Sequence, residues 1–213
     1  MTLLLFLPLI ILLLILLSAY NGFASSEIEL PENRYGEDKS VSPRILVAYA
    51  TRAGSTAEVA DAIGKKLAQK GAGVDVKPLK NVQTLNGYQA VVLGSAIRQG
   101  AILPELTAFV KTYKDELGKI PTAYFIVCMI AREDTEKNRK KADSYIDPLR
   151  AEVVPVDAGI FAGKLDYSKL SFIETIIIKY IIGTPEGDLR DWQKINDWAE
   201  NLSPKLLNIN KEK

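Results

Sequence analysis

The sequence predicts an α/β domain in which helices cover both faces of a parallel sheet. Three observations indicate this fold class. Short apolar runs, such as residues 45–49, have the composition of strands that are buried on both sides. Between these runs, apolar residues recur at helical spacing, as in the stripe that extends from Trp192 through Ile195 to Leu202. Strands and helices that alternate in this way form parallel sheets.

The expected strands and helices follow one another along residues 44–206. Ser55 and Glu58 form a capping box that begins the first helix, and Gly71 ends it. Pro104 suits the first turn of the second helix, which ends at Gly118. Strands are expected at residues 45–49, 74–79, 91–94, 123–129 and 153–160. Helices are expected at residues 55–70, 104–117, 134–145 and 189–202.

The composition excludes several classes of enzyme. The 213 residues carry 27 Lys and Arg against 26 Asp and Glu, for a formal net charge of +1, and include one Cys and no His. Without His there is no Ser-His-Asp or Cys-His nucleophile, and no metal site is expected. Cys128 alone forms neither an internal disulfide nor a cysteine-ligated cluster. The balanced charge does not suggest nucleic-acid binding, so we expect a cofactor to supply most of the chemistry.

An apolar segment lies at the N-terminus. Residues 3–17 are apolar, and the uncharged run continues to Phe23. This is long for the core of a signal peptide and short for a membrane span unless residues 18–20 are included. Gly22 and Ala24 provide a small-x-small cleavage site before Ser25. An uncleaved anchor, a cleaved export signal and a buried helix all remain open, and we expect membrane association on an undetermined side.

The composition divides the chain into four parts. Residues 1–24 are the signal or anchor, and residues 25–43 are a polar linker that contains Pro31, Gly36 and Pro43. The length of residues 44–206 suits one domain with its own core. Residues 207–213 are a charged tail.

The loop after the first strand has the features of a phosphate-binding turn. Its glycine and hydroxyl side chains directly precede a helix, whose free N–H groups and dipole favour an anion. The loop lacks the Gly-Lys-Ser/Thr of a Walker A motif and the G-x-G-x-x-G of a dinucleotide turn. A simple helix cap that contains a chance glycine is the alternative. The candidate residues are Thr51, Arg52, Ala53, Gly54, Ser55 and Thr56.

The Thr-x-x-Gly-x-Thr pattern of this loop resembles the FMN-phosphate loop of flavodoxin-like proteins. The resemblance is greatest to the flavodoxin-like, quinone-dependent protoporphyrinogen dehydrogenases. It covers nearly all of residues 44–204 and is carried by residues 50–56, 94–100, 121–132 and 191–202. It implies a three-layer sandwich whose five parallel strands have the order 2-1-3-4-5, and one non-covalent FMN.

The same resemblance implies which loops contact the flavin ring. One face would contact Ser95, Ala96, Ile97, Arg98 and Gly100, and the other Met129, Ile130, Ala131 and Arg132. Neither loop contains the aromatic residues that usually flank the ring in electron-carrier flavodoxins, which favours an enzyme with room for a substrate. Ordinary surface pairing is the alternative role for the two arginines. No catalytic side chain is predicted.

A second apolar segment, residues 169–182, is not needed by this fold. Its apolar residues occur on nearly every helical face, so it packs over the sheet, forms a homo-oligomer, or contacts a membrane or quinone. We expect a membrane-associated, FMN-dependent oxidoreductase that passes hydride or electrons from a reduced organic substrate to a quinone. The resemblance implies protoporphyrinogen IX as that substrate. The alternatives are an electron-transfer protein that docks to a redox partner, and an FMN-free interaction scaffold.

Overall fold

A computed structural model describes residues 30–36, 43–169, 180 and 186–207 of the chain. The chain forms two compact units, one of Glu29–Lys164 with Asp188–Lys213 and one of Met1–Ile28 with Leu165–Gly187. In the second unit, the described residues include the 3-10 turn η3 (Tyr167–Lys169), and the N–H of Tyr167 donates to Glu186 Oε1 at 3.0 Å. Most of residues 169–182, the second apolar segment, lie outside the described residues.

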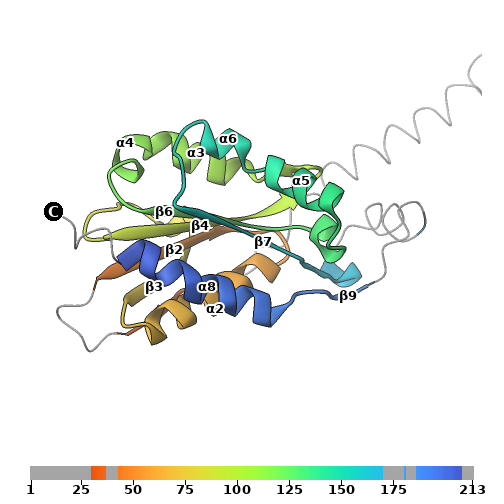
Figure 1. Cartoon of the computed structure of the whole chain (residues 1–213), viewed down its shortest axis with the longest axis horizontal. Helices are drawn as coiled ribbons and strands as arrows, with labels where there is room; N and C mark the ends of the chain where they lie inside the picture. Colours follow the sequence, from red (N-terminus) through yellow and green to blue (C-terminus); the bar gives the residue numbers. More distant parts are fainter. Residues whose placement is uncertain (1–29, 37–42, 170–179, 181–185, 208–213) are drawn as a thin grey trace, which may run out of the picture. The chain divides into compact units, whose positions relative to one another are not determined.

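The first unit contains a seven-stranded sheet between two layers of helices (Figure 1). Its main strands have the order β1-β3-β2-β4-β6-β7, and β5 pairs with β4. The parallel strands have the predicted order 2-1-3-4-5, and β1 and β5 are added to them. The strands are β1 (Asn33–Tyr35), β2 (Arg44–Ala50), β3 (Gly73–Pro78), β4 (Ala90–Arg98), β5 (Ala101–Ile102), β6 (Thr122–Val127) and β7 (Asp157–Phe161). Two short strands, β8 (Lys164–Leu165) and β9 (Gly187–Asp188), form a separate sheet.

The helices bury the apolar residues of both sheet faces. Ile45 and Val47 of β2 pack with the layer of α2 and α8, whereas Leu46 and Ala48 pack with the opposite layer. This alternation is the period of two expected of a strand that is covered on both sides. The helices are α2 (Ser55–Gln69), α3 (Pro104–Thr112), α4 (Lys114–Leu117), α5 (Glu136–Ser144), α6 (Asp147–Arg150) and α8 (Trp192–Leu207), with 3-10 turns η1 (Leu79–Asn81) and η2 (Met129–Arg132).

Several boundaries differ from the predictions. The second helix is divided into α3 and α4. The last strand begins at Asp157 rather than at residue 153, because the N–H of Val153 still donates to Leu149 O of α6 and Pro155 has no N–H to donate. Trp192 was expected in the buried stripe of the last helix, but it is 39% exposed. Its ring instead packs against the guanidinium of Arg190, 4.4 Å from the ring centroid.

The N-terminal segment differs most from the prediction. Residues 33–35, within the expected linker, form β1 and pair antiparallel with β3. Arg34 donates to Asp75 of β3 at 2.6 Å, and the hydroxyl of Tyr35 donates to Asp61 of α2. The side-chain amide of Asn33 also donates to Asp61, at 2.7 Å. This short polar segment therefore covers the edge of the sheet beside β3.

Within the part of the chain that the structure describes, no helix is long and apolar enough to span a bilayer. Residues 3–17, the predicted anchor, lie outside the described residues.

Candidate functional site

The conformation of the turn between β2 and α2 is fixed mainly by backbone hydrogen bonds around Gly54. Gly54 occupies the N-cap position of α2 in the left-handed conformation, with φ 89°, and no side chain caps the helix there. The carbonyl of Gly54 accepts from the N–H groups of Ala57 and Glu58 at 3.0 and 3.2 Å. The hydroxyl of Thr51 accepts from the N–H of Gly54 at 3.0 Å. A side chain at position 54 would meet open space, so the backbone conformation alone favours glycine here.

Thr56 is the residue of this turn that lacks a partner. Its side chain is fully buried, and its Oγ1 is the single buried side-chain polar atom without a hydrogen bond among the described residues. A buried hydroxyl without a partner is costly, so its presence indicates an absent ligand. The first N–H groups of a helix also lack intrahelical partners. The turn therefore fits a phosphate group, which accepts from both kinds of donor.

The second predicted loop, residues 94–100, is part of a tight hairpin. Arg98 and Ala101 pair across it, and Gln99 and Gly100 between them have φ values of 51° and 78°. Positive φ at both central residues is typical of a type I′ turn. The hydroxyl of Ser95, which is fully buried, accepts from the N–H of Leu103 at 3.1 Å. The hydroxyl of Ser95 thus stabilises the hairpin from inside the domain. Its contact with the flavin stays a prediction.

Packing in the core explains the glycine at position 94. A Cβ at Gly94 would lie 1.9–2.5 Å from ring atoms of Phe125 on β6. The absence of a side chain at Gly94 therefore makes room for the core of the domain.

The three predicted loops meet at one edge of the sheet. The register pairs Ala50 of β2 with Ser95 of β4, and Ala96 with Val127 of β6. The loops that follow β2, β4 and β6 are therefore neighbours, as expected for ligand-binding loops at the carboxyl ends of parallel strands. We call this edge, with residues 51–56, 95–100 and 129–132, the carboxyl edge.

Two of the predicted arginines form ion pairs at this edge. Arg52 Nη2 lies 2.5 Å from Glu105 Oε1, and Arg132 Nε lies 3.3 Å from Glu133 Oε1. The side chains of Arg52 and Arg132 remain 33% and 31% exposed. The pairing is thus compatible with an interaction with a ligand at the same edge.

Arg190 is a residue that the sequence analysis missed. Its side chain is 3% exposed, and its guanidinium donates to both carboxylate oxygens of Asp188 at 2.7 and 2.6 Å. It also lies 2.8 Å from Glu58 Oε2 and donates to the carbonyl of Ser55 at 3.4 Å. These hydrogen bonds from Arg190 lower the pKa of Asp188 below its usual range. Arg190 therefore fastens the chain before α8 to the first turn of α2, beside the phosphate-binding turn.

No local pattern in the sequence marks Arg190, because its partners Ser55 and Glu58 are more than a hundred residues away. The role of Arg190 becomes evident only in the folded domain, where the chain after β9 lies beside α2.

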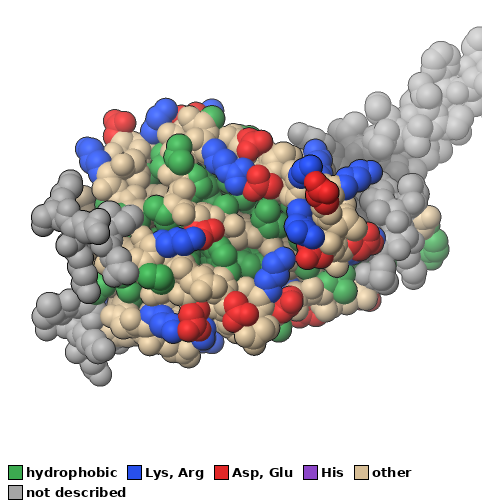
Figure 2. All heavy atoms as spheres, in the orientation of Figure 1, with side chains coloured by type: hydrophobic (Ala, Val, Ile, Leu, Met, Phe, Trp, Pro, Cys, Tyr) green, Lys and Arg blue, Asp and Glu red, His purple; other side chains and the backbone are tan. Residues whose placement is uncertain are grey.

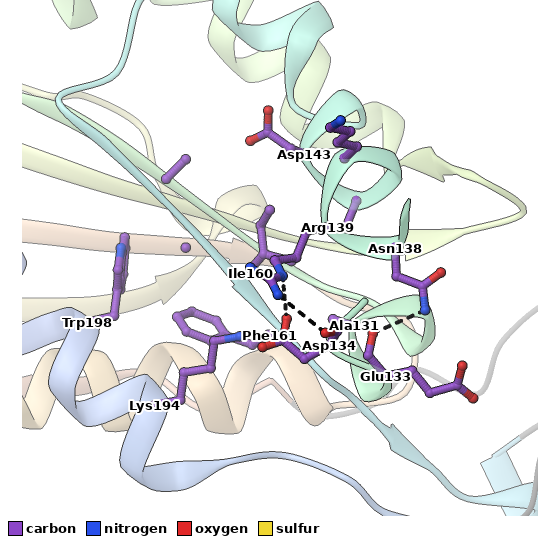
Figure 3. Close-up of a pocket in the computed structure, with 14 residues that line it drawn as sticks. Ala131, Glu133, Asp134, Asn138, Arg139, Asp143, Ile160, Phe161, Lys194 and Trp198 are labelled. Carbon is purple, nitrogen blue, oxygen red and sulfur yellow. Dashed lines mark hydrogen bonds and ion pairs between the residues drawn. The ribbon is translucent and has the colours of Figure 1, made fainter. Parts of the chain in front are cut away.

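A groove of about 620 Å³ lies along β7, the last strand of the sheet (Figure 3). Ala158, Ile160 and Phe161 of β7 form part of its lining between α5 and α8. Figure 2 shows apolar side chains between the two helical layers, with charged side chains around them. Arg139 and Asp134 form one ion pair at the rim, at 2.8 Å. Of the predicted cofactor residues, only Ala131 lines this groove, so the groove is distinct from the phosphate-binding turn.

Comparison with known proteins shows the family. Residues 46–190 match the family model of the flavodoxin domain. The chain belongs to the flavodoxin domain family. A protoporphyrinogen IX dehydrogenase (quinone) of Leishmania major is 31% identical over 167 residues, which cover 75% of this chain and 72% of that protein. The protein of the same name from Escherichia coli K12 is 25% identical over 172 residues and is covered to 94%.

Solved flavodoxins share the fold. An archaeal flavodoxin superposes with a TM-score of 0.51 at 16% identity, covering 76% of this chain and 98% of that structure. A short-chain flavodoxin associated with a bacterial microcompartment superposes with a TM-score of 0.52 at 12% identity, covering 77% and 99%. The family and the geometry of the phosphate-binding turn together indicate FMN as the cofactor. The chain is thus a flavodoxin-like protein of an FMN-type oxidoreductase family.

Proposed function

We propose that this chain is a membrane-tethered, FMN-dependent dehydrogenase that oxidises a protoporphyrinogen-type substrate and passes the electrons to a quinone. The observation that carries the proposal is the match to two protoporphyrinogen IX dehydrogenases (quinone) over 75% of this chain. The family model matches residues 46–190, a range that includes the loops of the carboxyl edge.

The chain's own residues would bind and orient the cofactor. The hydroxyl of Thr56 and the first N–H groups of α2 would hold the phosphate, and Gly54 keeps the turn open for it. The backbone of residues 95–100 and 129–132 would flank the ring. When bound, FMN supplies the redox step itself, by accepting hydride or electrons.

The loops of the carboxyl edge favour an anionic substrate. Arg52, Arg98 and Arg132 are their only ionisable side chains. Their guanidinium groups provide positive charge, part of which Glu105 and Glu133 balance, and no general base. A tetrapyrrole that bears carboxylates matches this charge, because arginine forms paired hydrogen bonds with carboxylates.

The absence of aromatic residues from residues 95–100 and 129–132 supports an enzyme rather than a carrier. A ring that no aromatic side chain covers leaves a face for the substrate to stack against. The membrane tether is the part of the proposal that rests on the apolar residues 3–23.

A turnover assay tests the proposal. The full chain, loaded with FMN, is mixed with protoporphyrinogen IX and a short-chain, water-soluble quinone without oxygen. We expect many turnovers for each FMN, with one quinone reduced for each two electrons removed. A chain that exchanges single electrons with a flavodoxin reductase, but does not oxidise the porphyrinogen, would be a carrier. A folded chain that stays colourless after incubation with FMN would be a scaffold.

A further inference from the structure

Both apolar segments that the parallel fold does not need are attached to the domain at the carboxyl edge. The first evidence is the direction of β1. Asn33 pairs with Val76 and Tyr35 with Val74, so β1 is antiparallel to β3. Residues 30–32, which precede Asn33, therefore lie toward the end of β3, at Pro78. The N-terminal part of the chain joins the domain at the edge that carries the cofactor loops.

Side-chain hydrogen bonds fix this attachment point. The hydroxyl of Tyr49, near the end of β2, donates to the carbonyl of Pro31 at 2.7 Å. The amide of Asn81 in η1 donates to Glu32 Oε1 at 2.5 Å. Leu30 packs against the core on the side of α2 and α8. The chain is thus part of the domain from Leu30 onward.

The length of chain before Leu30 limits how far this edge can be from a bilayer. Six residues, 24–29, separate Leu30 from Phe23, the end of the uncharged run. Fully extended, this segment spans about 25 Å at most. The opposite, amino edge of the sheet is farther by the length of a strand, about 20 Å. A bilayer that holds the uncharged run therefore lies within about 25 Å of the attachment point at the carboxyl edge.

The second apolar segment leaves from and returns to the same edge. The carbonyl of Phe161, at the end of β7, accepts from the N–H of Cys128, at the end of β6. On the return side, the N–H of Leu189 donates to Gly163 O at 3.2 Å. Arg190 follows directly and donates to Ser55 of the phosphate-binding turn. Residues 165–187 are thus joined to the domain at both ends beside the cofactor loops.

We propose that a lipid bilayer is the partner of the carboxyl edge, so that the loops around the flavin face the membrane. This inference rests on the proposed membrane tether and adds the orientation of the domain. A lipid-soluble quinone would then reach the cofactor loops from the bilayer without crossing water. The amino edge, which includes Val154, would face the aqueous phase.

A pair of labelled variants tests this orientation. Lys80, exposed in η1, marks the carboxyl edge, and Val154, 82% exposed before β7, marks the amino edge. Each is changed to cysteine in the full chain (Lys80→Cys, Val154→Cys) and labelled with a fluorophore. Cys128 provides little background, because burial raises the pKa of its thiol to about 11. The unaltered chain, treated with the same reagent, is the labelling control.

The labelled proteins are bound to phosphatidylcholine vesicles that contain lipids with a quencher on the headgroup. We expect quenching at position 80 to exceed quenching at position 154 by about threefold or more, since about 20 Å of strand separates the two edges. Equal or reversed quenching of vesicle-bound protein would overturn the orientation. Protein that does not bind the vesicles would overturn the tether and the orientation together.

A lengthened tether provides a matched control. Inserting about 30 Gly and Ser residues between residues 26 and 27 adds a flexible coil with a mean end-to-end distance of about 30 Å. We expect this insertion to reduce the difference in quenching to less than half. Turnover with a long-chain quinone in vesicles should fall several-fold, whereas turnover with the water-soluble quinone stays unchanged. Loss of turnover with both quinones would count against the proposed function instead. If both the difference in quenching and the turnover stay unchanged, residues 165–187 alone hold the carboxyl edge at the bilayer. Unchanged turnover with equal quenching at positions 80 and 154 would overturn the orientation.

Discussion

Changing Thr56 to valine should affect the stability of the apoprotein and the affinity for FMN in opposite directions. Thr56 is fully buried, and its hydroxyl lacks a partner in the ligand-free domain. An unpaired buried hydroxyl costs about 1–3 kcal/mol, and valine has nearly the same shape without it. We therefore expect Thr56→Val to leave the free energy of unfolding of the apoprotein unchanged or to raise it by about 1 kcal/mol.

The loss of FMN affinity follows from the same hydroxyl. A hydrogen bond to a charged group contributes about 1.5–3 kcal/mol, and about 1.4 kcal/mol corresponds to a tenfold change in Kd. The variant should therefore bind FMN about 10- to 150-fold more weakly. Its affinity for riboflavin, which lacks the phosphate, should not change. Quenching of flavin fluorescence measures both affinities, and denaturant unfolding of the apoprotein measures the stability.

Thr51→Val is the matched control in the same turn. The hydroxyl of Thr51 accepts from the N–H of Gly54, so its removal should destabilise the apoprotein by about 1 kcal/mol. If Thr56→Val destabilised the apoprotein as much as the control, or bound FMN as tightly as the unaltered chain, the assignment of the phosphate to this turn would be refuted.

Three further variants test other features. Asp75→Asn should lower stability by about 1–3 kcal/mol at pH 7. Burial opposes ionisation, but the hydrogen bonds of Tyr88 and Arg34 and the nearby charge of Arg44 outweigh it and lower the pKa of Asp75. The stabilisation by Asp75 is therefore complete above about pH 4 and is lost as the pH falls through the folded-state pKa. Unfolding curves of Asp75→Asn and of the unaltered chain should differ at pH 7 and coincide at pH 2. Gly94→Ala should lower the free energy of unfolding by about 1–3 kcal/mol through overpacking, and adding Phe125→Leu should recover part of that loss. A Gly94→Ala variant as stable as the unaltered chain would contradict the close contact with Phe125. Arg190→Met should lower the free energy of unfolding by about 1–3 kcal/mol, because hydrogen bonds to charged groups are lost. It should also weaken the binding of FMN more than that of riboflavin. Equal effects on the two affinities would restrict Arg190 to a structural role.

The sequence predicted the parts of the fold that depend on local composition. The apolar runs of β2, β4 and β6 lie where expected, because burial on both faces leaves a local pattern. The first helix also begins at Ser55, but the predicted capping box is wrong, because Gly54 occupies the N-cap position and no side chain caps the helix. The order of the parallel strands came from the family resemblance.

The remaining features depend on contacts between distant residues. β1 is only three residues long, and its polar sequence is stabilised by Asp75 and Asp61, which follow far along the chain. The hairpin at Gln99 requires a positive φ that glutamine rarely adopts. Two partners of Arg190, Ser55 and Glu58, lie in a helix that precedes it by more than a hundred residues. Local propensity contains none of this information.

The position of β1 also determines where a recombinant fragment of this protein should begin. A fragment that starts at residue 44, where the apolar pattern begins, would lack the strand that pairs with β3. The N–H and C=O groups on that side of β3 would then be available to other molecules, and exposed strand edges of this kind promote aggregation. The hydroxyl of Tyr49 would lose its acceptor, Pro31 O, as well. A fragment that starts no later than Leu30 keeps β1 paired with β3. Aggregation of shorter fragments would therefore reflect the missing strand rather than an unstable domain.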